Sequence, residues 1–142
     1  MTGILKVDTI QSSGGTTGLT IDSSGRVLTP ARPAFRAEKR ASNQDGSGVQ
    51  KITFEHVAFD VGSNYDTSNS RFVAPVDGIY FFQSTIRFVA DADTLDYAKH
   101  VVRVNNSAAA DLFQMNIRPD YMRNSHLNGS TLLQQTANQY VE

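Results

Sequence analysis

The chain has 142 residues, which is enough for one domain with its own core and a short appendage. Its formal net charge of −1 gives no electrostatic reason to bind nucleic acid or an anionic membrane. It contains no cysteine, which excludes disulfides, thiolate nucleophiles and zinc–thiolate sites. No apolar run approaches the roughly 18 residues of a membrane-spanning helix. We therefore expect neither nucleic acid nor a membrane among its partners.

Residues 1–32 are predicted to form an N-terminal docking arm. They hold three short β-prone clusters, separated by turns rich in Gly and Ser, and no aromatic residue. Such a segment buries too little surface to offset about 1–2 kcal/mol of backbone entropy per ordered residue. It is either a partly disordered leader or an arm that pairs with other copies or a larger assembly. Its aliphatic side chains would be costly to leave exposed to water, which favours the arm. The expected docking residues are Ile4, Leu5, Val7, Ile10, Leu19, Ile21, Val27 and Leu28.

The remaining residues, 33–142, are predicted to form one globular domain organised around two strands and a tight corner, Arg71–Phe88. In the longer strand, alternation puts Tyr80, Phe82 and Phe88 on one face and Phe81 on the other. A strand that is apolar on both faces is usually covered on both, so one face can meet the core and the other needs a second layer. In a small all-β chain, another subunit can supply that layer. The residues expected in the core or trimer interface are Phe72, Tyr80, Phe81, Phe82 and Phe88.

Short β-prone runs surround this central pair, and turn chemistry separates them. Helical spacing is not sustained over any window of 11 residues. Regularly spaced short strands indicate an all-β sandwich. The further strands are predicted at 34–40, 51–54, 56–60, 98–105, 112–117, 130–135 and 139–141, with loops between them that include 61–70, 90–96 and 118–129.

Several landmarks keep a recognisable order and spacing: Ala34–Ala37, Ile52–Phe54, Val57–Asp66, Ser70–Phe82, Ser130–Leu133 and Asn138–Val141. Together they resemble the C1q-like domain of the tumour-necrosis-factor-like jelly rolls, over roughly residues 33–142. The resemblance implies a jelly-roll sandwich that forms tight homotrimers, with aromatics such as Tyr80 and Phe82 near the three-fold axis.

The sequence departs from this family pattern at two places. Ser70 stands where the family has a glycine, which is a mild change if the φ angle permits it. The family also continues past the position of Glu142 and adds a strand that lies centrally in a sheet. Either the chain is truncated or the missing C-terminal strands come from elsewhere. We expect truncation, because a sandwich without a central strand would leave strand edges unpaired.

The arm carries a second resemblance. Leu5–Gln11, a Gly-rich turn and Leu19–Pro30 are similar to leader segments of bacteriophage fibre and virion proteins, often placed before C1q-like tips. The first fifteen residues also lack the basic and continuous apolar regions of a secretion signal. The resemblance implies a virion protein that is assembled in the host cytoplasm and released by lysis.

The sequence offers no convincing catalytic or cofactor site. Its three histidines, His56, His100 and His126, are scattered, and we expect surface or packing roles for them. No phosphate-binding loop is present, because Gly14 and Gly15 are not followed by a lysine and a helix. We therefore expect no enzyme activity and no cofactor.

One acidic stretch is a weak candidate for a metal site. Asp91, Asp93 and Asp96 form D-x-D-x-x-D, and calcium prefers such oxygen ligands. However, Leu95 and Asp96 occupy positions where a calcium loop carries Asp or Asn and then Gly. A solvated acidic loop is the expected outcome.

These observations predict a trimeric tail-fibre or head-fibre component. Its arm would bind other virion structural proteins, and its head would bind a host cell-surface glycan or protein. The alternatives are a decoration or capping protein without receptor contact and a secreted C1q-like ligand. Recognition is expected in the loops at 63–70, 90–96 and 118–129, because loops on a rigid sandwich carry binding residues.

Overall fold

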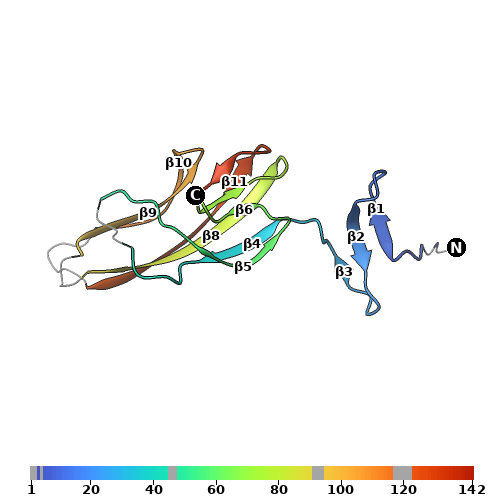
Figure 1. Cartoon of the computed structure of the whole chain (residues 1–142), viewed down its shortest axis with the longest axis horizontal. Helices are drawn as coiled ribbons and strands as arrows, with labels where there is room; N and C mark the ends of the chain where they lie inside the picture. The colour runs from blue at the N-terminus through green and yellow to red at the C-terminus, as the bar shows by residue number, and fades with distance from the viewer. Residues whose placement is uncertain (1–2, 4, 45–47, 91–94, 117–122) are drawn as a thin grey trace.

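The computed structural model describes residues 3, 5–44, 48–90, 95–116 and 123–142. These residues form β-strands and no helix, which confirms the all-β prediction. In the described part of the chain, therefore, no helix is long and apolar enough to cross a membrane. An elongated head lies beside a smaller sheet at the N-terminal end, with a short link between them (Figure 1).

The small sheet is the N-terminal arm. Its antiparallel strands follow chain order and are β1 (Thr9–Gln11), β2 (Thr17–Ile21) and β3 (Val27–Leu28). The turn between β2 and β3 is held by Asp22, whose Oδ1 accepts hydrogen bonds from the amides of Ser24 and Arg26, both at 2.9 Å. The turn signal in the sequence therefore corresponds to a turn in the structure.

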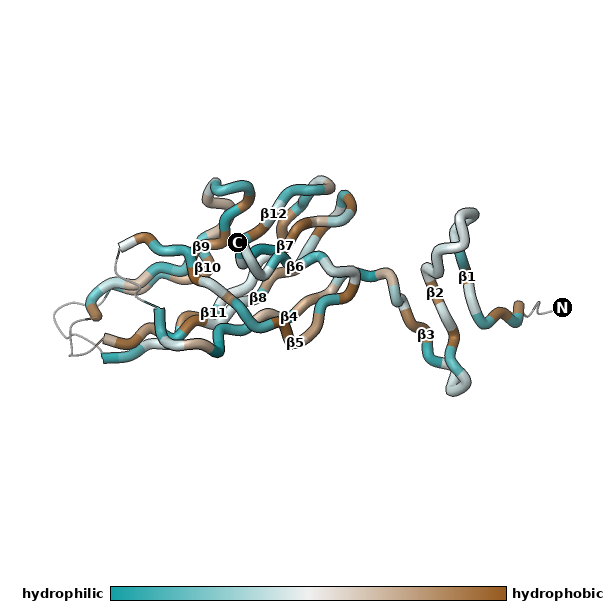
Figure 2. Tube along the Cα trace, in the orientation of Figure 1, coloured by the Kyte–Doolittle hydropathy of each residue, from teal (hydrophilic) through white to brown (hydrophobic). Residues whose placement is uncertain are grey.

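The head contains one five-stranded sheet and two strand pairs. The five-stranded sheet has the order β10-β9-β12-β7-β6, and the pairs are β11-β8 and β4-β5. Hydrophobic and hydrophilic residues alternate along these strands, as half-buried sheets require (Figure 2). The strands are β4 (Ala34–Glu38), β5 (His56–Val61), β6 (Tyr65–Asp66), β7 (Arg71–Val73), β8 (Gly78–Val89), β9 (Tyr97–Val104), β10 (Ser107–Asn116), β11 (Asn124–Gln135) and β12 (Tyr140–Val141).

Three predictions of local structure were wrong. The run 51–54 joins no strand ladder, and 65–66 forms a strand inside a predicted loop. Residues 124–129, predicted as loop, are the first half of β11 and pair with β8 along its length. The reason is long-range pairing, because the neighbouring strand rather than local composition decides this region.

The core of the head includes an aromatic cluster around Phe72, whose ring is buried. The Phe72 ring stacks on Phe35 with centroids 5.0 Å apart, and it also contacts Tyr80 at 5.4 Å and Phe82 at 5.7 Å. Phe35 in turn stacks on Tyr65 at 5.0 Å. These rings connect β4, β6, β7 and β8, so they hold the five-stranded sheet against both strand pairs.

Candidate functional site

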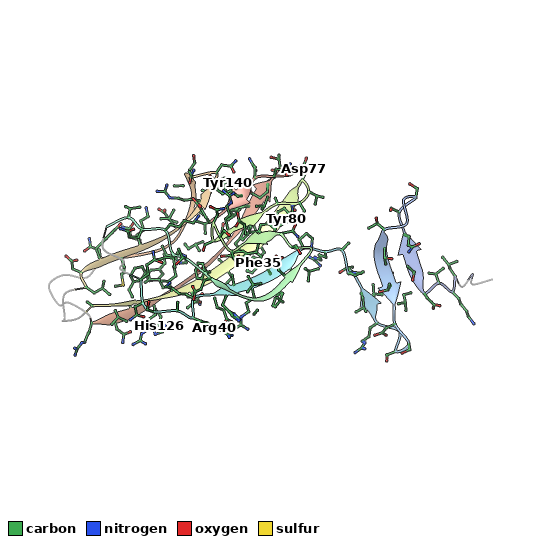
Figure 3. The ribbon with its side chains drawn as sticks, viewed as in Figure 1. Phe35, Arg40, Asp77, Tyr80, His126 and Tyr140 are labelled. Atoms are coloured by element: carbon green, nitrogen blue, oxygen red, sulfur yellow. The ribbon has the colours of Figure 1, made fainter. Side chains whose placement is uncertain are left out.

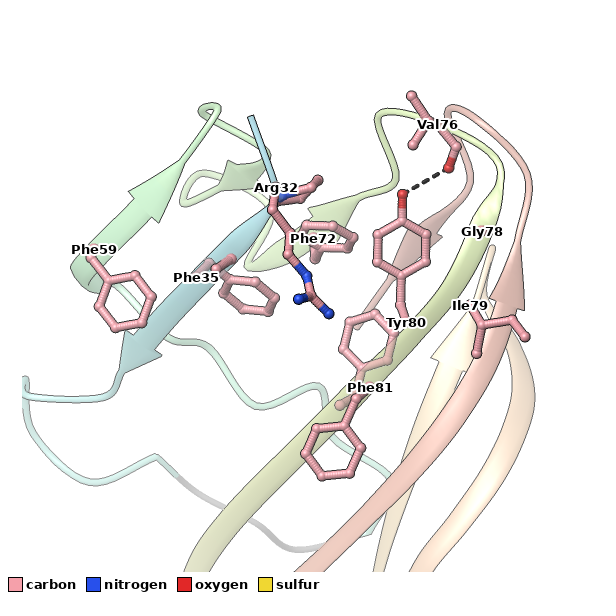
Figure 4. A pocket seen from close by; sticks show the side chains of 12 residues that line it. Arg32, Phe35, Phe59, Phe72, Val76, Gly78, Ile79, Tyr80 and Phe81 are labelled. Carbon is pink, nitrogen blue, oxygen red and sulfur yellow. Dashed lines mark hydrogen bonds between the residues drawn. The ribbon is translucent and has the colours of Figure 1, made fainter. Parts of the chain in front are cut away.

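A cavity of about 420 Å³ opens between β4 and β8 (Figure 4). Among the described strands, β4 pairs only with β5 and β8 pairs only with β11. Each therefore has one edge whose backbone donors and acceptors meet no strand partner within the described residues. The cavity is lined by Arg32, Pro33, Ala34, Phe35, Phe59, Phe72, Val76, Gly78, Ile79, Tyr80, Phe81 and Phe82.

Tyr80 forms part of the inner wall of this cavity. Its hydroxyl donates a 2.7 Å hydrogen bond to the carbonyl oxygen of Val76, and its ring contacts Phe72. Figure 4 shows this hydrogen bond as a dashed line. Because Val76 lies in the corner before β8, this hydrogen bond connects the corner to the inner face of β8.

The outer face of the β11–β8 pair carries an exposed apolar group, which we name the outer patch. Phe81 lies directly opposite Leu132 in the strand register, and Ile79 is two residues before Phe81 on the same face. Their side chains are 63%, 66% and 73% exposed, respectively. Three neighbouring large apolar side chains on one sheet face mark a surface suited to contact with another protein.

The predicted core and interface residues divide between the two faces. Phe72 is buried, at 3% exposure, while Tyr80, Phe82 and Phe88 are half-buried on the inner face of β8. Phe81 alone among them faces outward. In a single chain, Tyr80 and Phe82 therefore belong to the core, and the face left for a second subunit is that of Phe81.

The outer face becomes polar farther along the two strands. The Thr85 hydroxyl donates to Asn128 Oδ1 at 3.2 Å, and Arg87 lies opposite His126. Both members of this last pair are exposed. His126 lies farther from the arm than Tyr80 does (Figure 3). This pairing was not predicted from the sequence, because residues 124–129 were expected to form a loop.

Two family landmarks have structural roles in the head. Ser70 is buried with a φ of 44°, and its Oγ accepts a 3.1 Å hydrogen bond from the amide of Phe54. Asp60 accepts hydrogen bonds from the amides of Asn64 at 3.0 Å and Tyr65 at 2.9 Å. The Ser70 backbone thus adopts the left-handed region that a glycine would adopt more easily.

The structure does not bring the three histidines together. His56 is on β5, with Nδ1 3.8 Å from a Glu38 carboxylate oxygen, and His126 is exposed on β11. His100, on β9, is buried, and its Nδ1 has no hydrogen-bond partner within the described residues. Burial lowers the pKa of His100 below its ordinary value, because the charged imidazolium is poorly solvated there.

The described residues contain no cluster of three or more His, Asp or Glu side chains that could hold a metal ion. Two of the three weak candidates, Asp91 and Asp93, lie outside the described residues. Asp96 is half-buried just before β9.

The predicted docking residues of the arm differ in exposure. Leu5, Ile10, Val27 and Leu28 are 83%, 52%, 61% and 48% exposed, respectively. The half-buried members are Val7, Leu19 and Ile21, while Ile4 lies outside the described residues. Four of the eight predicted docking residues are therefore exposed in the described part of the arm.

Residues 34–141 match the family described as the C1q domain. The chain is also similar to "Uncharacterized protein YqcC" of Bacillus subtilis (strain 168), with 31% identity over 102 residues. That alignment spans 65% of this chain and 26% of the relative, so the similarity concerns about a quarter of the relative's length.

Proposed function

Because the chain belongs to the C1q domain family, we propose that it is a homotrimeric virion component that docks by its arm and binds the host surface with its head. C1q domains are non-catalytic binding modules and typically trimerise. The outer patch carries the proposal for this chain, because its three large side chains are each more than 60% exposed. Burying each of them is worth about 1.5–3 kcal/mol.

We assign the subunit contact to the outer patch rather than to Tyr80 and Phe82. Those two rings already contact Phe72 inside the head, at 5.4 and 5.7 Å. They line the cavity between β4 and β8, on the side of the strand away from the outer patch. Phe81 and Leu132 instead face outward on the open face of the β11–β8 pair.

The role of the arm is supported by its exposed aliphatics and by its similarity to leader segments of phage virion proteins. The arm sheet has only three short strands and no aromatic residue, so it has little apolar surface of its own to bury. Three arms held together by a trimeric head start from a high effective concentration, which favours ordering on a particle surface.

Docking is tested by deleting residues 1–30 and blotting purified particles for the chain. We expect the deleted form to remain a trimer but to be lost from particles, whereas the full chain is retained. Incorporation of the deleted form at the level of the full chain would contradict the docking role. A replacement of the arm by a Gly/Ser segment of equal length controls for spacing.

Host binding is tested separately by adding the purified full-length trimer in excess to host cells before the particles. A receptor-binding head is expected to occupy the host surface and to lower particle adsorption. Unchanged adsorption, together with no detectable binding of labelled trimer to cells, would leave a decoration role instead. Heat-unfolded protein at the same concentration is the control.

A further inference from the structure

The polar end of the outer face carries Arg87 and His126, and no described residue of β8 or β11 supplies a carboxylate beside them. Arg87 of β8 and His126 of β11 are direct cross-strand partners, and both are exposed. None of the ion pairs in the described part of the chain involves either residue. The other outward positions of this strand pair are all uncharged: Ile79, Phe81, Gln83, Thr85 and Val89 on β8, and Asn124, Asn128, Ser130, Leu132 and Gln134 on β11.

If the outer patch is the subunit contact, Arg87 and His126 lie near the contact between subunits. The inference therefore rests on the proposed trimer. The arm leaves one end of an elongated head (Figure 1). Three arms can dock together on one surface when the three-fold axis runs along the length of the head. Phe81 and Arg87 then face the axis on the same side of one strand, about 20 Å apart at 3.4 Å per residue.

In that trimer, three Arg87 side chains and three His126 side chains surround the axis beyond the outer patch. Three guanidinium groups in a partly desolvated space repel one another, and the outer face of β8 and β11 supplies no carboxylate to offset them. A counter-anion removes this cost. A planar guanidinium donates a fork of hydrogen bonds that suits oxyanions, and an imidazole N–H adds one more donor.

We propose that Arg87 and His126 of three copies form a binding site for an inorganic tetrahedral oxyanion on the three-fold axis. A tetrahedral oxyanion has a three-fold axis of its own, so three of its oxygens can each face one subunit. The site is incomplete in one chain, since one Arg87–His126 pair supplies donors from one side only. Sulfate serves as the probe because it keeps its charge across the neutral pH range.

The experiment measures trimer dissociation of the full chain by analytical ultracentrifugation, in sodium sulfate and in sodium chloride at equal ionic strength. For the wild-type chain we expect dissociation to require at least tenfold higher dilution in sulfate. Sulfate also stabilises compact states without specific binding, so the comparison needs variants. Arg87→Gln should reduce the difference between the salts to its nonspecific part, while Arg103→Gln, on β9 of the other sheet, should retain the full difference.

Crystals grown with selenate in place of sulfate give a direct measurement. We expect an anomalous selenium peak on the three-fold axis between the Arg87 side chains, and its loss in Arg87→Gln. An equal sulfate effect in wild type and Arg87→Gln would overturn the proposal. So would contact of Arg87 with a carboxylate of a neighbouring subunit in place of the anion.

A further variant separates failure of this site from failure of the proposed trimer. If Phe81→Asp dissociates the trimer but sulfate has no specific effect on wild type, the outer patch is the interface and the anion site is rejected alone. If Phe81→Asp leaves the trimer intact, the proposed interface is rejected and the axial site with it.

Discussion

Phe81 and Leu132 lie directly opposite each other across the β8–β11 pair, and both side chains are about two-thirds exposed, at 63% and 66%. Cross-strand apolar pairs stabilise a sheet most when a further layer covers them. Within the described chain no layer covers this pair. A neighbouring subunit that covers it would gain the burial energy of both side chains at once.

Phe81→Asp is expected to convert the proposed trimer into folded monomers, because a carboxylate would be buried in an apolar contact without a partner. Sedimentation velocity measures the oligomer, and circular dichroism verifies that the head remains folded. Tyr97→Asp is the matched control, since Tyr97 is an exposed aromatic on β9, at 51%. A folded trimer of Phe81→Asp, at the concentration where wild type is a trimer, would contradict the assignment.

Phe72→Ala should destabilise the head strongly. The ring is 3% exposed and contacts Phe35, Tyr80 and Phe82, so its removal leaves a cavity at the centre of the aromatic cluster. Such truncations cost about 3–5 kcal/mol of unfolding free energy. Chemical denaturation measures the loss. Phe59→Ala, at a half-exposed ring, should cost less than about 1.5 kcal/mol; equal losses would show that the cluster is not the core.

At Ser70, alanine is expected to be worse than glycine. Both substitutions remove the hydrogen bond from the Phe54 amide, worth about 1 kcal/mol. Glycine also relieves a backbone held at a φ of 44°, whereas alanine keeps that strain. We expect Ser70→Gly to be nearly neutral and Ser70→Ala to lose about 1–2 kcal/mol of unfolding free energy. Thermal and urea unfolding test this order, and a reversed order would contradict it.

Gly129→Ala should disrupt the packing of β11 on β10. A Cβ at Gly129 would lie 2.6 Å from Leu112 Cβ and 2.7 Å from the Leu112 carbonyl oxygen. Backbone must move to accept it, at a cost of about 1–3 kcal/mol or more. Gly78→Ala on β8 is the control, because its Cβ would meet only the Tyr80 ring at 3.6 Å. The two unfolding midpoints should therefore differ clearly.

Acidification from pH 7 to pH 5 should destabilise the head through His100. Burial lowers the pKa of His100 in the folded state, so below about 6.5, the ordinary histidine value, the unfolded chain binds a proton more readily. The stability that the neutral, buried His100 contributes is therefore fully present above that pH and is lost as the pH falls through it. His100→Gln should give a flatter profile of unfolding free energy between pH 7 and pH 5. Parallel profiles for the two proteins would exclude this role for His100.

The sequence predicted the elements whose signal is local. Alternation along β8 predicts Tyr80, Phe82 and Phe88 on one face and Phe81 on the other, and the structure has this arrangement. The candidate interface was harder to predict. The sequence gives no reason to choose between the two faces of β8, because both carry aromatics. The choice depends on where Phe72 lies, and Phe72 covers only the inner face.

The remaining errors arise from contacts distant in sequence. Residues 51–54 were predicted as a strand, but the side chain of Gln44 makes the hydrogen bonds that a neighbouring strand would make. Its Nε2 donates to the Lys51 carbonyl oxygen, and its Oε1 accepts a 3.0 Å hydrogen bond from the Thr53 amide. The first half of β11 is polar outside and has one fully buried side chain, Leu127. Local composition resembles a loop there, and only the pairing with β8 makes it a strand.

The position of β12 has a consequence for synthesis of the protein. Val141 pairs with Phe72 of β7 on one side and with Val104 of β9 on the other, so the middle of the five-stranded sheet is filled by residues near the end of the sequence. During translation, β7 and β9 leave the ribosome long before the strand that joins them. Until β12 is synthesised, β7 and β9 each have an edge whose backbone groups lack this strand partner. A chaperone that shields such edges would have its greatest effect in this interval.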